Sequence, residues 1–356
     1  MIVLFFFVAI ISLLGIKRRN EVLESSNQGY LSKDSTNAIK GIFILLVFIR
    51  HANQYVKQVD YDFSRILDRL FILTDGLLAQ LIVVMFLFFS GYGIMCSINR
   101  GGQKYIRTIP KKRLLNTLIN FDIAVLIYFI LAVILKRPMS CNQVLLSFIG
   151  WDGMGNSNWY IFVILCCYLS SFLAFSLINY FKHSKAYRNA LLLNTFFIIL
   201  IAVFLIKEGK PRHWYDTIMV YPLGMWFALY KSYFECFVAK SANYSFLLIV
   251  SIIVFVMSYG LLALNITSSA FDWFLWSIRV LSLILTIILI MKKWNIGNKF
   301  IVWAGANLFP LYIYQRLPML ILAPYLSDKP YAFFALTFIV SCALIFVYKK
   351  IEVKLL

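Results

Sequence analysis

Long apolar segments separated by short polar stretches follow one another along the whole chain of 356 residues. A membrane-spanning α-helix needs about 20 predominantly apolar residues, and about eleven segments come close to or reach that length. These segments are residues 1–16, 38–51, 77–98, 114–135, 159–181, 190–206, 215–230, 246–266, 271–291, 300–322 and 331–348. Because their apolar residues are continuous and do not alternate with polar ones, the pattern predicts an all-α, polytopic integral membrane bundle of about eleven transmembrane helices and argues against a β-barrel.

The second segment, residues 38–51, carries an ionisable residue near each end, Lys40 and His51. In an α-helix these side chains would lie on nearly the same face, about 16 Å apart along the axis. Ionisable groups inside a membrane helix are costly, so both are candidates for a functional site. Lys40 would equally mark a cytoplasmic boundary and His51 the far interface, and the spacing does not decide between the two interpretations. The segment is short, so we expect it to be buried among other helices or to extend through residues 51–55.

The composition excludes a soluble chain of this size, because 62% of the residues are hydrophobic and only 14% are charged. The net charge of +19 raises the possibility of a nucleic-acid partner. Lys and Arg instead cluster in short runs between apolar segments, which is typical of orientation signals, so no nucleic-acid partner is expected. The six cysteines fall mostly in apolar segments without metal-ligand spacing, so we expect no disulfide and no metal site.

The distribution of basic residues predicts the orientation in the membrane. Residues 1–16 lack a basic start and a small-residue cleavage site, and Lys17, Arg18 and Arg19 follow them, which favours an uncleaved anchor with its N-terminus outside. Roughly twice as many Lys and Arg lie on the side of Lys17 as on the opposite side. This bias places Lys40 and the C-terminus in the cytoplasm and His51 deeper or towards the outside.

Two polar loops can be explained either by ligand binding or by a purely structural role. Residues 100–113 carry six cations and no acidic residue, which fits either an orientation signal or a cytoplasmic mouth that attracts a phosphate-bearing donor. Residues 150–160 combine Gly with Trp, Asp and Asn, which suits sugar hydroxyls, but a turn with an aromatic belt explains this composition better.

Asp122 and Arg279 are the charges placed deepest in the apolar segments. A structural ion pair between them would offset part of the cost of burial, and we favour it over a catalytic role for either. His183 and His213 lie in loop contexts, where solvated histidines are the default, so neither is given a role.

Several of these pieces, in this order, resemble the acyltransferase 3 family, polytopic membrane acyltransferases that include O-antigen acetyltransferases. The family's first core helix carries a basic residue, ten residues and then histidine, as Lys40 and His51 do here, with Lys in place of the more usual Arg. Further similar motifs are Phe86-Leu-Phe-Phe-Ser90-Gly91-Tyr92, Lys111-Lys112-Arg113-Leu-Leu, Asn158-Trp159-Tyr160, Tyr221-Pro222-Leu-Gly224-Met and Asn307-Leu-Phe-Pro-Leu-Tyr312-Ile-Tyr. Where many members have a second histidine after the late Tyr, this chain has Gln315-Arg316, which weakens any role assumed for that position.

The resemblance implies about ten core helices, with residues 1–34 as an added N-terminal transmembrane anchor and cytoplasmic linker, residues 35–348 as the membrane acyltransferase domain and residues 349–356 as a short basic cytoplasmic tail. It also implies transfer of an acyl group, most often acetyl, from cytoplasmic acyl-CoA to a sugar hydroxyl of a surface polysaccharide or its lipid-linked precursor, in a bacterial cytoplasmic membrane and without a metal.

The expected roles follow from side-chain chemistry. His51 would act as general base or as a transient acyl carrier. Lys40, Lys111, Lys112 and Arg113 would hold the phosphates of the donor. Ser90 and Gly91 would allow close helix approach beside the groove, where Ser90 would also bind substrate by a hydrogen bond. Trp159 and Tyr160 would contact the acceptor.

Two other functions remain open at this point. A transporter for polysaccharide or lipid-linked sugar would use Asp122, Arg279 and the basic mouth to line a path. A glycan polymerase is a third possibility, but the sequence has no large outer loop to support it.

Overall fold

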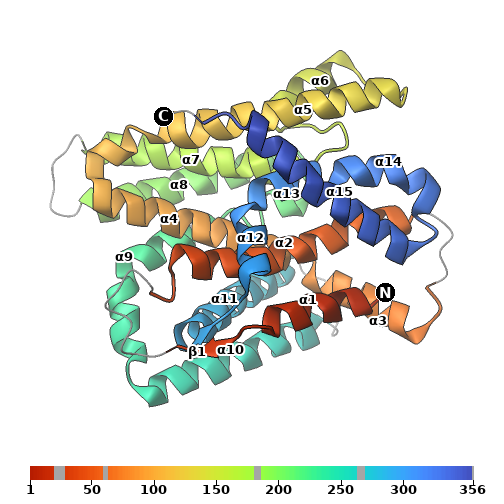
Figure 1. Ribbon diagram of the computed structural model, residues 1–356. Helices are drawn as coiled ribbons and strands as arrows, with labels where there is room; N and C mark the ends of the chain where they lie inside the picture. Colours follow the sequence, from red (N-terminus) through yellow and green to blue (C-terminus); the bar gives the residue numbers. More distant parts are fainter. Residues whose placement is uncertain (20–28, 59–62, 180–185, 263–268, 355–356) are drawn as a thin grey trace.

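The computed structural model describes residues 1–19, 29–58, 63–179, 186–262 and 269–354, and its fold is about 81% helical (Figure 1). His183, residues 20–28 of the expected linker, residues 355–356 of the expected tail, and the expected segment ends at residues 180–181 and 263–266 lie outside the described residues.

The order of elements is dominated by helices. They are α1 (Val3–Leu13), β1 (Lys17–Arg18), α2 (Lys33–Val56), α3 (Ile66–Leu78), α4 (Leu81–Ile106), η2 (Pro110–Leu115), α5 (Asn116–Ile134), α6 (Cys141–Phe148), α7 (Trp159–Asn179), α8 (Ala186–Lys207), η3 (Arg212–Trp214), α9 (Val220–Val238), α10 (Ser241–Leu262), α11 (Ser269–Lys293), β2 (Trp294–Asn295), α12 (Lys299–Ala306), α13 (Leu308–Tyr314), α14 (Arg316–Leu326) and α15 (Pro330–Ile351). The two short strands pair antiparallel, with Lys17 opposite Asn295.

Among the described residues, eight helices are long and apolar enough to cross a membrane. They are Lys33–Val56, Ile66–Ile106, Pro110–Ile134, Trp159–Leu177, Ala186–Lys207, Ser241–Leu261, Phe271–Lys293 and Pro330–Ile351. This fits a multi-pass membrane protein, as the apolar pattern predicts. The expected number of eleven spans is not confirmed.

Three of the expected spans differ from continuous crossing helices. Residues 1–16 form only the 11-residue α1, and α9 begins at Val220, after the start expected for residues 215–230. The segment 300–322 is broken into α12, α13 and α14, because Asn307 leaves helical geometry at the end of α12 with ψ of 26°. Pro310 and Pro318 then lie in the first turns of α13 and α14, where the missing N–H of proline costs no helical hydrogen bond.

Glycines allow α4 and α9 to pack backbone against backbone. A Cβ atom added at Gly91 of α4 would lie 2.0 Å from the carbonyl oxygen of Tyr221, and one added at Gly224 of α9 would lie 2.1 Å from that of Phe88. Any side chain larger than hydrogen would therefore force the two helices apart. The close helix approach expected at Gly91 is confirmed.

The same device joins α2 to α12, with α2 crossing the middle of the molecule (Figure 1). A Cβ atom at Gly41 would meet the carbonyl oxygen of Ile301 at 1.9 Å, and one at Gly305 would meet that of Asn37 at 1.8 Å. The N-terminus of α2 is capped by Ser32, whose hydroxyl accepts a hydrogen bond from the Ser35 backbone N–H at 3.2 Å. α2 is thus a continuous, mostly buried helix, extended at both ends relative to residues 38–51.

Large apolar side chains are exposed along α8 and α10. They include Leu192, Phe196, Leu200 and Phe204 on α8 and Phe246, Ile249, Ile253 and Val256 on α10. Such contiguous apolar faces are unfavourable in water and suit lipid.

Candidate functional site

Helix α2 carries both Lys40 and His51, and the two side chains lie in different surroundings. Lys40, near its start, lines the larger of two cavities. His51, three turns further on, is half-buried next to Tyr312, with ring centroids 6.1 Å apart. The structure therefore confirms that one helix holds both residues. Lys40 lies at the larger cavity, and His51 lies against Tyr312.

Asp75 of α3 fixes the end of α2 that carries His51. Its carboxylate accepts hydrogen bonds from Arg50 Nη1 at 3.0 Å, Asn53 Nδ2 at 3.0 Å and Lys57 Nζ at 3.2 Å, and Arg50 also donates to the Asp75 carbonyl oxygen at 2.6 Å. Asp75 is buried, so these charge-assisted bonds offset its desolvation. The rotation of the last two turns of α2 is thereby set.

Aromatic rings connect His51 to the interior. Tyr312 packs against Tyr160 at a centroid distance of 5.3 Å, and Tyr160 packs edge-on against Phe86 at 6.1 Å. The Nδ1 atom of His51 and the hydroxyl of Tyr312 are buried without a hydrogen-bond partner within the part of the chain that the structure describes. Buried polar atoms of this kind mark a place where a ligand or water binds.

The larger cavity has a volume of about 960 Å³ and a strongly basic lining. The cations around it are Lys33, Lys40, Arg100, Arg113 and Lys231, and no carboxylate is among its described lining residues. Such a surface attracts phosphate groups. Lys33, Arg100 and Lys231 were missed by sequence reasoning, although Arg100 lies in the basic loop of residues 100–113.

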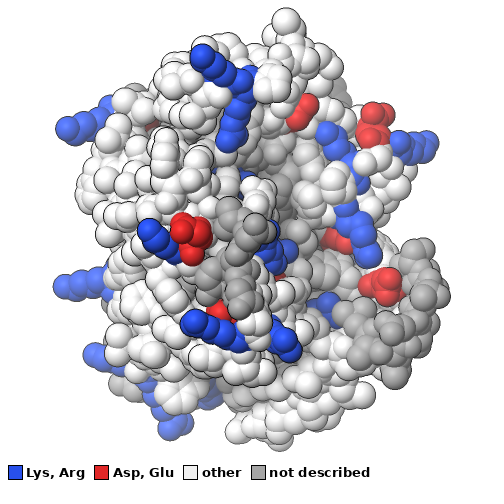
Figure 2. All heavy atoms as spheres, turned by 90° about the vertical axis from the view of Figure 1, so that its right-hand side faces the viewer, with Lys and Arg blue, Asp and Glu red and all other residues white. Residues whose placement is uncertain are grey.

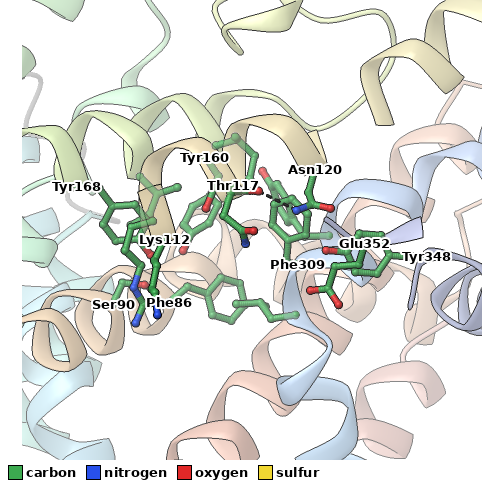
Figure 3. Close-up of a pocket in the computed structure, with 16 residues that line it drawn as sticks. Phe86, Ser90, Lys112, Thr117, Asn120, Tyr160, Tyr168, Phe309, Tyr348 and Glu352 are labelled. Atoms are coloured by element: carbon green, nitrogen blue, oxygen red, sulfur yellow. Dashed lines mark hydrogen bonds between the residues drawn. The ribbon is translucent and has the colours of Figure 1, made fainter. Parts of the chain in front are cut away.

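The smaller cavity, of about 240 Å³, shares Ser90, Arg113 and Tyr168 with the larger one. Figure 3 shows Ser90, Lys112 and Tyr168 at one end and Tyr348 and Glu352 at the other. Its lining also includes Phe86, Tyr160 and Tyr312. The two cavities therefore meet at Ser90, Arg113 and Tyr168, and the smaller one reaches the rings beside His51.

The expected donor-binding residues are divided between these cavities. Arg113 lines both, and its Nε donates to the Tyr105 hydroxyl at 3.3 Å. Lys112 lines the smaller cavity. Lys111 is exposed and lines neither of the two.

The expected acceptor contacts Trp159 and Tyr160 also have different positions. Tyr160 is buried in the wall of the smaller cavity. Trp159 packs edge-on against His213 with centroids 5.1 Å apart. Burial and the nearby Arg50 lower the pKa of His213 below its usual range.

Gln315 and Arg316 follow Tyr312 at the start of α14. Gln315 is fully buried, and its Nε2 donates to the Tyr312 carbonyl oxygen at 3.1 Å. Arg316 donates from Nε to the Ser157 hydroxyl at 3.1 Å and from Nη2 to Gln54 Oε1 at 2.6 Å. The sequence marked this pair only as a departure from the family pattern and did not indicate the contacts of Arg316 with Ser157 and Gln54.

The expected ion pair between Asp122 and Arg279 is wrong. Arg279 of α11 donates instead to the Ser258 hydroxyl at 3.1 Å and carbonyl oxygen at 2.8 Å, and it lies 4.0 Å over the ring of Tyr259. The Oδ1 atom of Asp122 is buried without a partner in the described structure. The guanidinium is satisfied by α10, and neither residue lines the two cavities.

A family model described as an acyltransferase domain matches residues 34–349, which is nearly the whole chain. No curated protein matches, and no solved structure matches.

Proposed function

Because this chain belongs to the acyltransferase 3 family, we propose that it moves an acyl group, most simply acetyl, from cytoplasmic acyl-CoA to a sugar hydroxyl of a surface polysaccharide or its lipid-linked precursor. Membership and fold make it a membrane acyltransferase. The donor and the acceptor are the proposed part.

The meeting of the two cavities carries this proposal. The larger one suits the phosphates of a coenzyme A donor, because five cations surround it and its volume of about 960 Å³ fits the upper end of small-molecule sites. The thioester would pass Ser90 and Tyr168 into the smaller cavity and approach Tyr160 and Tyr312, next to His51.

His51 would act as a proton carrier in the transfer of the acyl group from the thioester to the acceptor hydroxyl. The imidazole takes the proton of the acceptor hydroxyl, whose oxygen attacks the thioester carbonyl carbon. The carbon–sulfur bond then breaks, and the coenzyme A thiolate receives the proton from the imidazolium. The same imidazole would serve as a transient acyl carrier if the acyl group first moved to its nitrogen.

The test is the mass of the glycan in cells that make the wild-type protein, His51→Ala or His183→Ala, with the amount of protein in the membrane checked. Acetylation adds about 42 Da per group, and we expect this increment with wild type and with the control His183→Ala. His51→Ala should lose it, because general-base catalysis supplies about 10²–10⁴-fold. Unchanged glycan mass across all variants, together with failure to export the polymer when the protein is absent, would favour a transporter instead.

A further inference from the structure

Arg316 is a cation beside the proposed reaction centre that has no carboxylate partner among the described residues. Its two hydrogen-bond partners, Ser157 and Gln54, are neutral. A guanidinium has five N–H donors, so about three remain for a ligand. Arg50, the other arginine near His51, differs because Asp75 neutralises it at 3.0 Å.

Arg316 lies close to His51, because it donates a hydrogen bond to Gln54 on the same helix as His51. Gln54 follows His51 by three positions on α2, so their side chains are neighbours on one helix face. Gln54 is exposed and Arg316 is half-buried, so the guanidinium lies close to the surface on the His51 side of α2. Ser157 belongs to the loop that leads into Trp159 and Tyr160.

Residues close in sequence to Gln54, Ser157 and Arg316 carry buried polar atoms without a hydrogen-bond partner. Within the described chain they are His51 Nδ1, Gln315 Oε1, Asn156 Nδ2 and the Tyr312 hydroxyl. Gln315 is 0% exposed and Asn156 is 7% exposed, so water does not satisfy them freely. Buried polar atoms of this kind leave hydrogen-bonding capacity for water or for a polar ligand.

We propose that the acceptor is anionic, with a carboxylate or phosphate close to the hydroxyl that is acylated, and that Arg316 is the residue that binds this anion. The inference rests on the proposed function. Both anions accept paired N–H bonds from one guanidinium. Figure 2 shows Lys and Arg side chains spread over the end of the molecule at which α2 ends, with Asp and Glu side chains among them.

The test measures binding to the full-length protein in a neutral maltoside detergent. The probes are galactotriose, trigalacturonate and galactotriose carrying 6-phosphates, which differ only at carbon 6 of each sugar. At least one anionic probe should bind the wild type about tenfold to a hundredfold more tightly than galactotriose. Arg316→Gln should abolish this preference, Arg316→Lys should retain part of it, and Lys329→Gln, an exposed cation in the turn before α15, should retain all of it.

Equal binding of all three probes, or a preference that survives Arg316→Gln, would overturn the inference. A preference abolished by saturating phosphatidylglycerol would also overturn it, since the anion would then belong to a lipid headgroup. Failure of the proposed function gives a different result, namely no thioester consumption by the wild type with any probe. The binding preference can still be measured in that case.

Discussion

Lys40 and His51 lie on one helix, but the structure places them in different surroundings. Lys40 is one of five cations around the larger cavity, so its charge adds to a shared field. His51 is half-buried against Tyr312, which lines the smaller cavity, and no histidine is among the described lining residues themselves. Loss of Lys40 should therefore weaken donor binding, whereas loss of His51 should remove the chemistry.

Lys40→Ala should raise the KM for acyl-CoA about tenfold with kcat nearly unchanged, because one charge-assisted contact to the donor is lost. Lys40→Arg should restore most of the affinity. Lys111→Ala is the matched control, since Lys111 is exposed and lines neither cavity. Steady-state kinetics on purified protein measure both constants, and a lower kcat at unchanged KM would contradict this role.

His213 should make stability depend on pH. Burial and Arg50 lower its pKa in the folded protein, whereas an unfolded histidine titrates near pH 6.5. Below about pH 6.5 the unfolded chain binds the proton and the folded protein does not, so stability falls until the pH reaches the lowered pKa.

His213→Phe keeps an aromatic ring against Trp159 but removes this titration. Between pH 7 and pH 5, the Tm of the wild type should fall further than that of His213→Phe. Thermal unfolding in detergent measures the difference, and parallel curves would show that His213 does not titrate in this way.

At the level of helices, two glycine contacts decide how the site is assembled. Gly41 and Gly305 join α2 to α12, and Gly91 and Gly224 join α4 to α9. Ser90, next to Gly91, lines both cavities. The walls of the proposed donor path thus depend on helix spacing that only glycine permits.

Gly91→Ala should destabilise the protein by about 2 kcal/mol or more, because its Cβ would lie 2.0 Å from the Tyr221 carbonyl oxygen and backbone must shift. Gly93→Ala on the same helix is the matched control, since a Cβ there meets nothing within 4 Å. It should leave stability unchanged or raise it slightly through helix propensity. Equal Tm values for the two variants would show that α4 and α9 are not in backbone contact.

In the whole molecule, the two ends of α2 correspond to two different groups of polar residues. The end with Lys40 lies with Arg100 and Arg113 around the larger cavity. The C-terminal residues lie at the far end of the smaller cavity, which Glu352 lines, and Asn120 pairs there with both backbone groups of Val353 at 2.8 Å and 3.0 Å. The end with His51 lies with Gln54, Ser157 and Arg316.

Membrane orientation is tested with a membrane-impermeant maleimide on intact cells. After the exposed Cys141 and Cys236 are replaced by Ser, Lys329→Cys should be labelled in intact cells and Lys354→Cys only after lysis. This result is expected because the excess of Lys and Arg on one side of the predicted spans places the C-terminus in the cytoplasm. The opposite labelling would place the basic cavity outside and leave it without access to a cytoplasmic donor.

Properties that depend on local sequence could be predicted from it. The apolar segments indicated a helical membrane bundle, since a spanning helix satisfies its own backbone and needs only a long apolar run. The spacing of Lys40 and His51 placed them on one helix, which α2 confirms. The motif around Gly91 indicated close packing, because only a missing side chain allows such contact.

Properties that depend on which helices become neighbours could not be predicted in this way. Arg279 and Asp122 looked like partners in the sequence, but Arg279 of α11 donates its hydrogen bonds to Ser258 of α10, and Asp122 Oδ1 has no partner among the described residues. Arg316 is far from His51 in the sequence, and only the packing of α14 against α2 brings it to Gln54. The sequence by itself determined that the chain folds as a helical membrane bundle and which helix carries His51. The tertiary structure decided which charges surround that histidine, because hydrogen bonds between distant helices leave no periodic pattern along the chain.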